Sequence, residues 1–189
     1  MRSKYDTRAL VLARAHAGEA NTFVTLLTPD LGLVYARAQS LRKTGAKLAH
    51  ALATFAESEV VLVRGKEGWR VAGAVLEENW FVRLKRPDTR AAAARVSGLL
   101  LRLVAGEEQD TKLFPIVRGF LEALAELPPD LSEAAEALAV LRILAALGLD
   151  SGAIPGEASD FSHALLEGVA QKRAEYVARI NTGIAASGL

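Results

Sequence analysis

A cluster of cationic side chains lies in the segment RAQSLRKTGAKLAHAL, which spans residues 37–52. The segment holds Arg37, Arg42, Lys43 and Lys47, and no acidic residue stands among them. Positive charges on long, flexible stems bind phosphate groups, and a protein that follows a phosphate backbone needs several of them. A merely solvated loop is the alternative, but four uncompensated cations favour a polyanionic ligand.

More cations surround a predicted hairpin turn, GKEG at residues 65–68, and these are Arg64, Lys66 and Arg70. Tyr5, Tyr35 and Trp69 are aromatic candidates for base stacking, although half-buried strand positions suit a core role equally well. Residues 1–86 hold 14 Lys and Arg against 8 Asp and Glu, whereas residues 87–189 hold 9 against 14. This asymmetry indicates that the first half meets a polyanion.

The residues that catalysis or metal binding requires are sparse in this chain. There is no cysteine, and His16, His50 and His163 lie far apart in the sequence. The glycine spacings of phosphate-binding loops are absent, and no nucleophile stands near a base in a recognisable motif. We therefore expect a binding protein that is not an enzyme and uses no cofactor or metal. Without a membrane span or a clear signal peptide, a cytoplasmic protein is expected.

Short strands are predicted through the first half of the chain. Period-two alternation in LVYARA puts Arg37 on the face opposite Ala36 and Ala38. A short helix is predicted at residues 46–53, and the strands are predicted at residues 7–13, 22–28, 33–38, 58–64 and 69–77. Five strands with a helix between the third and fourth are the connectivity of an OB-fold, a small barrel that often binds single-stranded nucleic acid. An SH3-like barrel or another small sheet fits the same pattern.

Helical periodicity replaces the strand pattern beyond Pro87. Asp88 or Thr89 is expected to cap the first of these helices, and the last is expected to break at Gly168 or Gly183. The predicted helices cover residues 88–105, 110–127 (with Pro115 moving the start toward Phe114), 132–148 and 160–188. The fold class is therefore α+β, with a barrel domain over residues 1–80 and an all-α domain over residues 81–189.

An ordered set of short motifs in the first 75 or so residues is similar to a known family. GEAN at 18–21, LLTPDLG at 26–32, AQSLRKTGAKL at 38–48 and ALATF at 51–55 follow one another as in the N-terminal domain of RecO, the bacterial recombination mediator. The helical half resembles RecO more weakly. The chain departs from many members because it has no cysteine zinc module and reads QSLRKTGAK where the family carries a KGARK-type loop.

The resemblance implies a recombination mediator that works in recombinational DNA repair. Members bind single- and double-stranded DNA, anneal complementary strands and act with RecR on DNA coated by single-strand-binding protein (SSB). A groove in the helical half is expected to take the acidic, hydrophobic C-terminal tail of SSB, and the residues assigned to it are Phe114, Arg118, Phe120, Leu121 and Arg142. Two alternatives stay open: a protein-interaction scaffold with little DNA affinity, and an OB-fold protein that binds RNA or the ribosome.

Overall fold

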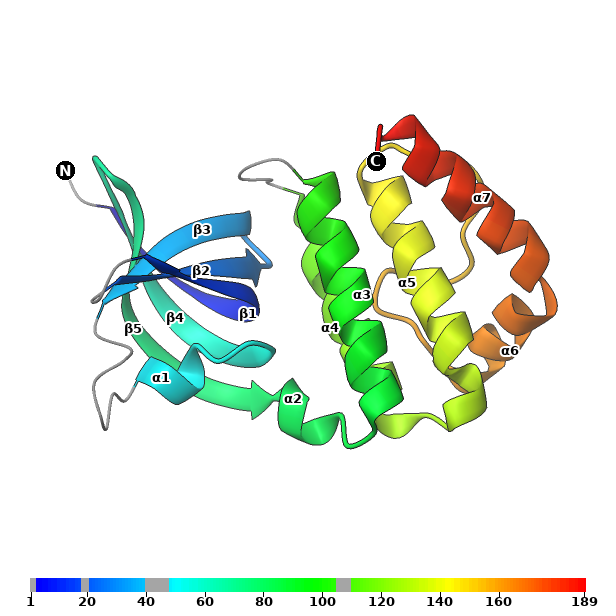
Figure 1. The fold of residues 1–189 in the computed structure, drawn as a ribbon, viewed down its shortest axis with the longest axis horizontal. Coiled ribbons are helices and arrows are strands. Elements are labelled where there is room, and N and C mark those ends of the chain that lie inside the picture. The colour runs from blue at the N-terminus through cyan, green and yellow to red at the C-terminus, as the bar shows by residue number, and fades with distance from the viewer. Residues whose placement is uncertain (1–2, 18–20, 40–47, 105–109) are drawn as a thin grey trace. The chain divides into compact units, whose positions relative to one another are not determined.

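The computed structural model of this chain describes residues 3–17, 21–39, 48–104 and 110–189. These residues form two compact units: the first holds the described residues up to Val82 together with residues 110–114, and the second holds those of 83–104 and 115–189. The first unit holds the strands and two short helices, and the second holds most of the longer helices (Figure 1). The predicted order, a strand-rich half followed by a helical half, is confirmed.

The five strands close into a barrel in the order β1-β2-β3-β5-β4. Neighbouring strands pair antiparallel, except that β3 and β5 pair parallel. The elements of this unit are β1 Ser3–Ala17, β2 Asn21–Thr28, β3 Gly32–Gln39, α1 Leu48–Ala51, β4 Ala56–Gly65, β5 Gly68–Asn79 and α2 Trp80–Arg83. A closed five-stranded barrel with a helix between β3 and β4 is an OB-fold, so this prediction is confirmed.

Every strand extends beyond its predicted bounds, and β1 extends furthest. A β-bulge between Val11 and Ala13 lets this long strand bend, so that its first part pairs with β4 and its second part with β2. The extra residues are mostly polar and exposed, and they therefore lack the apolar alternation by which a strand is recognised in a sequence. The helix α1 is shorter than the predicted one, and the predicted residues 46 and 47 lie outside the described part of the chain.

Alternating side chains of β3 divide between the barrel interior and its outer face. Val34, Ala36 and Ala38 are buried in the barrel core, whereas Tyr35 is exposed and Arg37 is half-buried. The predicted alternation is thus confirmed, because successive side chains of a strand point to opposite faces of the sheet. The outer face of β3 therefore carries the polar and aromatic side chains that a ligand can reach.

The second unit is built around the helix α5. Nine of its 15 residues are buried because α3, α6 and α7 all pack against it. The elements are α3 Pro87–Leu103, α4 Leu113–Glu126, the short 3-10 helix η1 Pro129–Leu131, α5 Ser132–Ala146, α6 His163–Gln171 and α7 Arg173–Ala186. In the described part of the chain, none of the helices combines the length and the hydropathy that a transmembrane span requires.

Two predictions about helix ends are wrong. Neither Asp88 nor Thr89 caps the helix α3, which begins at Pro87, a residue that suits the first helical position. The Thr89 hydroxyl instead donates to the Arg86 carbonyl at 2.9 Å. The last helical segment breaks at Lys172, not at a glycine. A Cβ at Gly183 would lie 3.0 Å from Leu144 Cδ1, so this glycine allows α7 to approach α5 closely.

The segment between α5 and α6 is held by two arginines. Arg142 of α5 donates to the carbonyl oxygens of Pro155 and Asp160 at 2.8 Å and of Ala158 at 3.2 Å. Burial lowers the pKa of Arg142, and the negative charge of Asp160 opposes that effect. Because this arginine is only 4% exposed, it acts as an internal support for the segment.

The second arginine, Arg179 of α7, makes a two-pronged contact with Asp150. Its Nη2 and Nε lie 2.6 and 3.1 Å from Oδ2 and Oδ1 of that carboxylate, whose side chain is 8% exposed. The hydrogen bond from Arg179 lowers the pKa of Asp150 and in turn raises the pKa of the guanidinium group. This pair ties the end of the chain to the segment that follows α5.

Asp150→Asn is expected to lower the free energy of unfolding by about 1.5–3 kcal/mol at neutral pH, the range for hydrogen bonds to charged groups. The folded pKa of Asp150 is depressed, so its contribution is present above the ordinary carboxyl value of about 3.9 and is lost as the pH falls through the folded pKa. Urea unfolding of both proteins at neutral pH and near pH 3 measures the difference. A difference that stays constant over this range would contradict the prediction.

Candidate nucleic-acid interface

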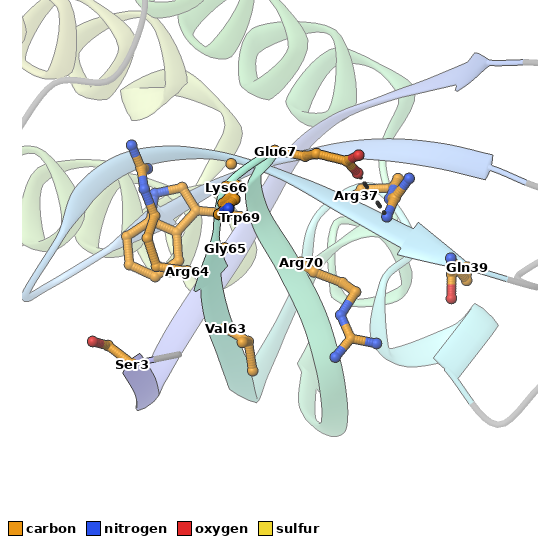
Figure 2. Close-up of a pocket in the computed structure, with 11 residues that line it drawn as sticks. Ser3, Arg37, Gln39, Val63, Arg64, Gly65, Lys66, Glu67, Trp69 and Arg70 are labelled. Atoms are coloured by element: carbon orange, nitrogen blue, oxygen red, sulfur yellow. Dashed lines mark ion pairs between the residues drawn. The ribbon is translucent and has the colours of Figure 1, made fainter. Parts of the chain in front are cut away.

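Four predicted cations gather at one end of the barrel, around the hairpin that joins β4 to β5. They are Arg37, Arg64, Lys66 and Arg70, and they line a cavity of about 800 Å³ (Figure 2). The remaining lining residues are Ser3, Gln39, Val63, Gly65, Glu67, Gly68 and Trp69. The site thus combines strands β3, β4 and β5 with the start of β1.

Strand register brings Arg37 and Arg70 together. Arg37 lies opposite Arg70 in the parallel pairing of β3 with β5, and Arg70 lies opposite Val63 of β4. Directly opposed residues of neighbouring strands share a face, so both arginines belong to the outer face of the barrel. Two like charges side by side are unfavourable unless an anion lies between them.

Glu67, at the hairpin turn, places a carboxylate beside one of these two arginines. Its Oε2 lies 3.5 Å from Nη2 of Arg37, the ion pair drawn as a dashed line in Figure 2. The glutamate side chain is 84% exposed and that of Arg37 is 34% exposed, so water screens the pair and weakens it. A phosphate group could displace such a carboxylate without disturbing the core.

Trp69 contacts two neighbouring side chains beside the cavity. The guanidinium group of Arg64 lies 4.9 Å from the centre of the Trp69 ring, and the Tyr5 ring meets it edge to face at 5.2 Å and 71°. Trp69 also packs against the barrel core. The ring therefore has a structural role, and its use for base stacking, which the sequence left open, is not supported by these contacts.

Lys66 lies in the turn between β4 and β5, and its side chain is exposed. Gly68, which ends this turn, has a φ of 93°, a conformation that L side chains rarely adopt. The glycine thus allows the tight turn that places Lys66 beside the cavity. The other predicted cations, Arg42, Lys43 and Lys47, lie outside the described residues, and their role stays a prediction.

One residue that the sequence analysis overlooked belongs to the same outer face. Phe23 of β2 lies opposite Arg37 in the pairing of β2 with β3, and it is 44% exposed. Its neighbours Thr22 and Val24 are buried, as is most of the strand, so periodicity alone gives no sign of an exposed ring. What distinguishes Phe23 from the other apolar residues of β2 is its position opposite Arg37.

The residues predicted to hold a partner's tail lie mostly in the interior. Phe114, Phe120, Leu121 and Arg142 are buried, and the Phe120 and Phe161 rings lie 6.2 Å apart. Arg118 is the member with a partly exposed side chain, and its Nη1 lies 2.9 Å from Oε2 of Glu122. A groove lined by these side chains would require the helices to separate, so partner binding here stays a prediction without a preformed surface.

The barrel is the part of this chain that matches a known protein family. The family model described as "Recombination protein O N terminal" matches residues 1–76, which cover all of the strands except the end of β5. Residues 1–76 belong to the RecO family. The resemblance to RecO stated from the sequence motifs is thus confirmed, and with it the OB-fold.

Curated proteins named DNA repair protein RecO extend the match into the helices. That of Dehalococcoides mccartyi strain 195 is 34% identical over 120 residues, which are 64% of this chain and 47% of the relative. That of Roseiflexus sp. strain RS-1 is 34% identical over 121 residues, which are 64% of this chain and 42% of the relative. That of Synechococcus elongatus is 32% identical over 107 residues, which are 57% and 35% of the two chains. The matched region therefore spans less than half of each relative.

Proposed function

We propose that this RecO-like chain binds single- and double-stranded DNA through its barrel and acts in recombinational DNA repair. In this proposal it promotes annealing of complementary strands, with RecR and the C-terminal tail of SSB as partners, and it catalyses no covalent step. The names of the relatives, DNA repair protein RecO, support the repair role. The observation that carries DNA binding is the gathering of Arg37, Arg64, Lys66 and Arg70 around one open cavity.

The composition of this cavity favours electrostatic binding over catalysis. Glu67 is the one acid among its described lining residues, and it is paired with Arg37. Acid–base catalysis requires a titratable group poised near the reacting atoms, whereas phosphate binding requires only fixed cations. A surface of this kind also lowers the mutual repulsion of two phosphate backbones, which would allow complementary strands to meet.

Fluorescence anisotropy of a labelled single-stranded DNA oligomer, titrated with the protein at several salt concentrations, tests this function. We expect binding that weakens steeply with salt, because each engaged phosphate of a single strand contributes about −0.7 to the slope of log K against log salt. A duplex of the same length should also show measurable binding. Absence of binding to either DNA at low salt would contradict the proposal and favour the scaffold alternative.

A separate experiment tests the cations of residues 40–47, which lie outside the described residues. Replacing Arg42, Lys43 and Lys47 together by alanine is expected to weaken binding of the single strand and to make its salt slope shallower by about 1–2, since up to three phosphate contacts are lost. Tryptophan fluorescence should show an unchanged barrel, because Trp69 and Trp80 both lie in that unit. An unchanged affinity and slope would remove these three residues from the interface.

A further inference from the structure

Two exposed aromatic rings stand on the outer face of the barrel beside the paired arginines. Phe23 of β2 is 44% exposed and Tyr35 of β3 is 37% exposed. Leu27 and Leu33, which lie opposite one another at the far end of the same two strands, are fully buried. On these two strands, the large apolar side chains that are exposed thus lie at the end that carries the cations.

Strand register places these rings and the arginines in one continuous row. Phe23 lies opposite Arg37, Arg37 lies opposite Arg70, and Tyr35 precedes Arg37 by two residues, so that all four share the outer face. Phe23 and Tyr35 are diagonal neighbours on adjacent strands, a relation that separates their Cα atoms by about 7–8 Å. Each ring therefore lies near a cation, and the two rings are far enough apart to stack on two different bases.

Exposed hydrophobic residues are common on protein surfaces, and one such ring alone would carry no argument. The combination is informative, since single strands of nucleic acid are bound by aromatic rings that stack on bases, next to cations that follow the backbone. Trp69 is a poor candidate for this role because Arg64 and Tyr5 already contact its ring. Tyr5 is 39% exposed but lies on β1 with its ring against Trp69, so Phe23 and Tyr35 are the exposed aromatic residues of β2 and β3.

We infer that Phe23 and Tyr35 stack on bases of a single DNA strand whose phosphates lie along Arg37 and Arg70. This inference rests on the proposed DNA binding and adds that the barrel contacts the bases as well as the phosphates. Bases in a duplex are already stacked and paired inside the helix, so the two rings can contribute only to single strands. The outer face of β2 and β3 thereby gives the chain a preference for single-stranded over double-stranded DNA.

The test compares an oligothymidine with an abasic oligomer of the same length, which has the same phosphates and no bases. Phe23→Leu and Tyr35→Leu keep an apolar side chain but remove the ring. Each is expected to lower affinity for the oligothymidine by about tenfold, in line with the usual contribution of one stacked base, and the double variant by more. Affinity for the abasic oligomer, affinity for a duplex and the salt slope should not change, because the cations are intact.

Matched controls separate stacking from a general loss of apolar surface. Phe81→Leu changes another exposed phenylalanine of the same unit, 47% exposed and outside the row, and should leave affinity unaltered. Phe23→Tyr and Tyr35→Phe retain a ring and should bind like the wild type. If the two leucine variants bind oligothymidine normally, or lose affinity equally for the abasic oligomer, the inference is overturned while DNA binding stands. If the wild-type protein binds no DNA at all, both are overturned.

Discussion

Replacement of Arg37, Lys66 and Arg70 together by alanine is expected to lower affinity for single-stranded DNA by about a hundredfold at low salt. The three cations line one cavity, and Arg37 and Arg70 lie opposite each other on neighbouring strands. Because each lost phosphate contact removes about 0.7 from the salt slope, the slope should become shallower by about 2. Anisotropy titrations at several salt concentrations measure both quantities. We leave Arg64 intact because it stacks on Trp69 and its loss would disturb the barrel end.

Two controls make this experiment specific. The triple variant Arg102→Ala, Lys172→Ala, Arg173→Ala makes the same change in charge on exposed side chains of the helical unit, and it should have little effect if DNA binds the barrel. Glu67→Gln removes the carboxylate that pairs with Arg37, and it should raise affinity severalfold. Equal losses in the two triple variants would mean that net charge, not the barrel surface, governs binding.

Arg142→Ala is expected to destabilise the helical unit by about 3–5 kcal/mol, because several hydrogen bonds from a charged group are lost together. This is a large part of the stability of a typical domain. The substitution leaves three partly buried carbonyl oxygens, those of Pro155, Ala158 and Asp160, without the donor that now holds them. It also removes the guanidinium group that lies 4.7 Å from the centre of the Phe161 ring. Urea unfolding followed by circular dichroism measures the loss, since the helices dominate that signal.

The two tryptophans of the chain, Trp69 and Trp80, both belong to the barrel unit and report its unfolding separately. If the units unfold independently, Arg142→Ala should shift the circular dichroism transition and leave the fluorescence transition in place. Arg173→Ala, which breaks an exposed ion pair with Glu133, serves as the control and should cost less than about 1 kcal/mol. An equally small effect of Arg142→Ala would contradict a supporting role for the buried arginine.

Local patterns in the sequence were sufficient to predict the order and kind of the elements. Alternation along β3, the glycine turn before β5 and the change to helical periodicity after Pro87 all depend on neighbours in the chain, which a sequence displays directly. Ordered motifs in the first half were likewise enough to indicate the RecO family, which the family match over residues 1–76 confirms. Helix ends were less predictable: the break falls at Lys172, between two helices that both pack against α5, and no local breaker residue marks it.

The make-up of the candidate site was only partly visible in the sequence. Arg37 and Arg70 are 33 positions apart, and only the parallel pairing of β3 with β5 brings them side by side. Phe23 appears in the sequence as one more apolar residue of a strand, and Arg142 was expected to line a partner-binding groove, yet Phe23 is exposed and Arg142 is buried. Composition and periodicity thus determined that a cationic, strand-rich domain precedes a helical one, and the ordered RecO-like motifs indicated that the first is an OB-fold. Strand register and burial are non-local properties, so only the tertiary structure decided which side chains share a face with the arginines and which support the core.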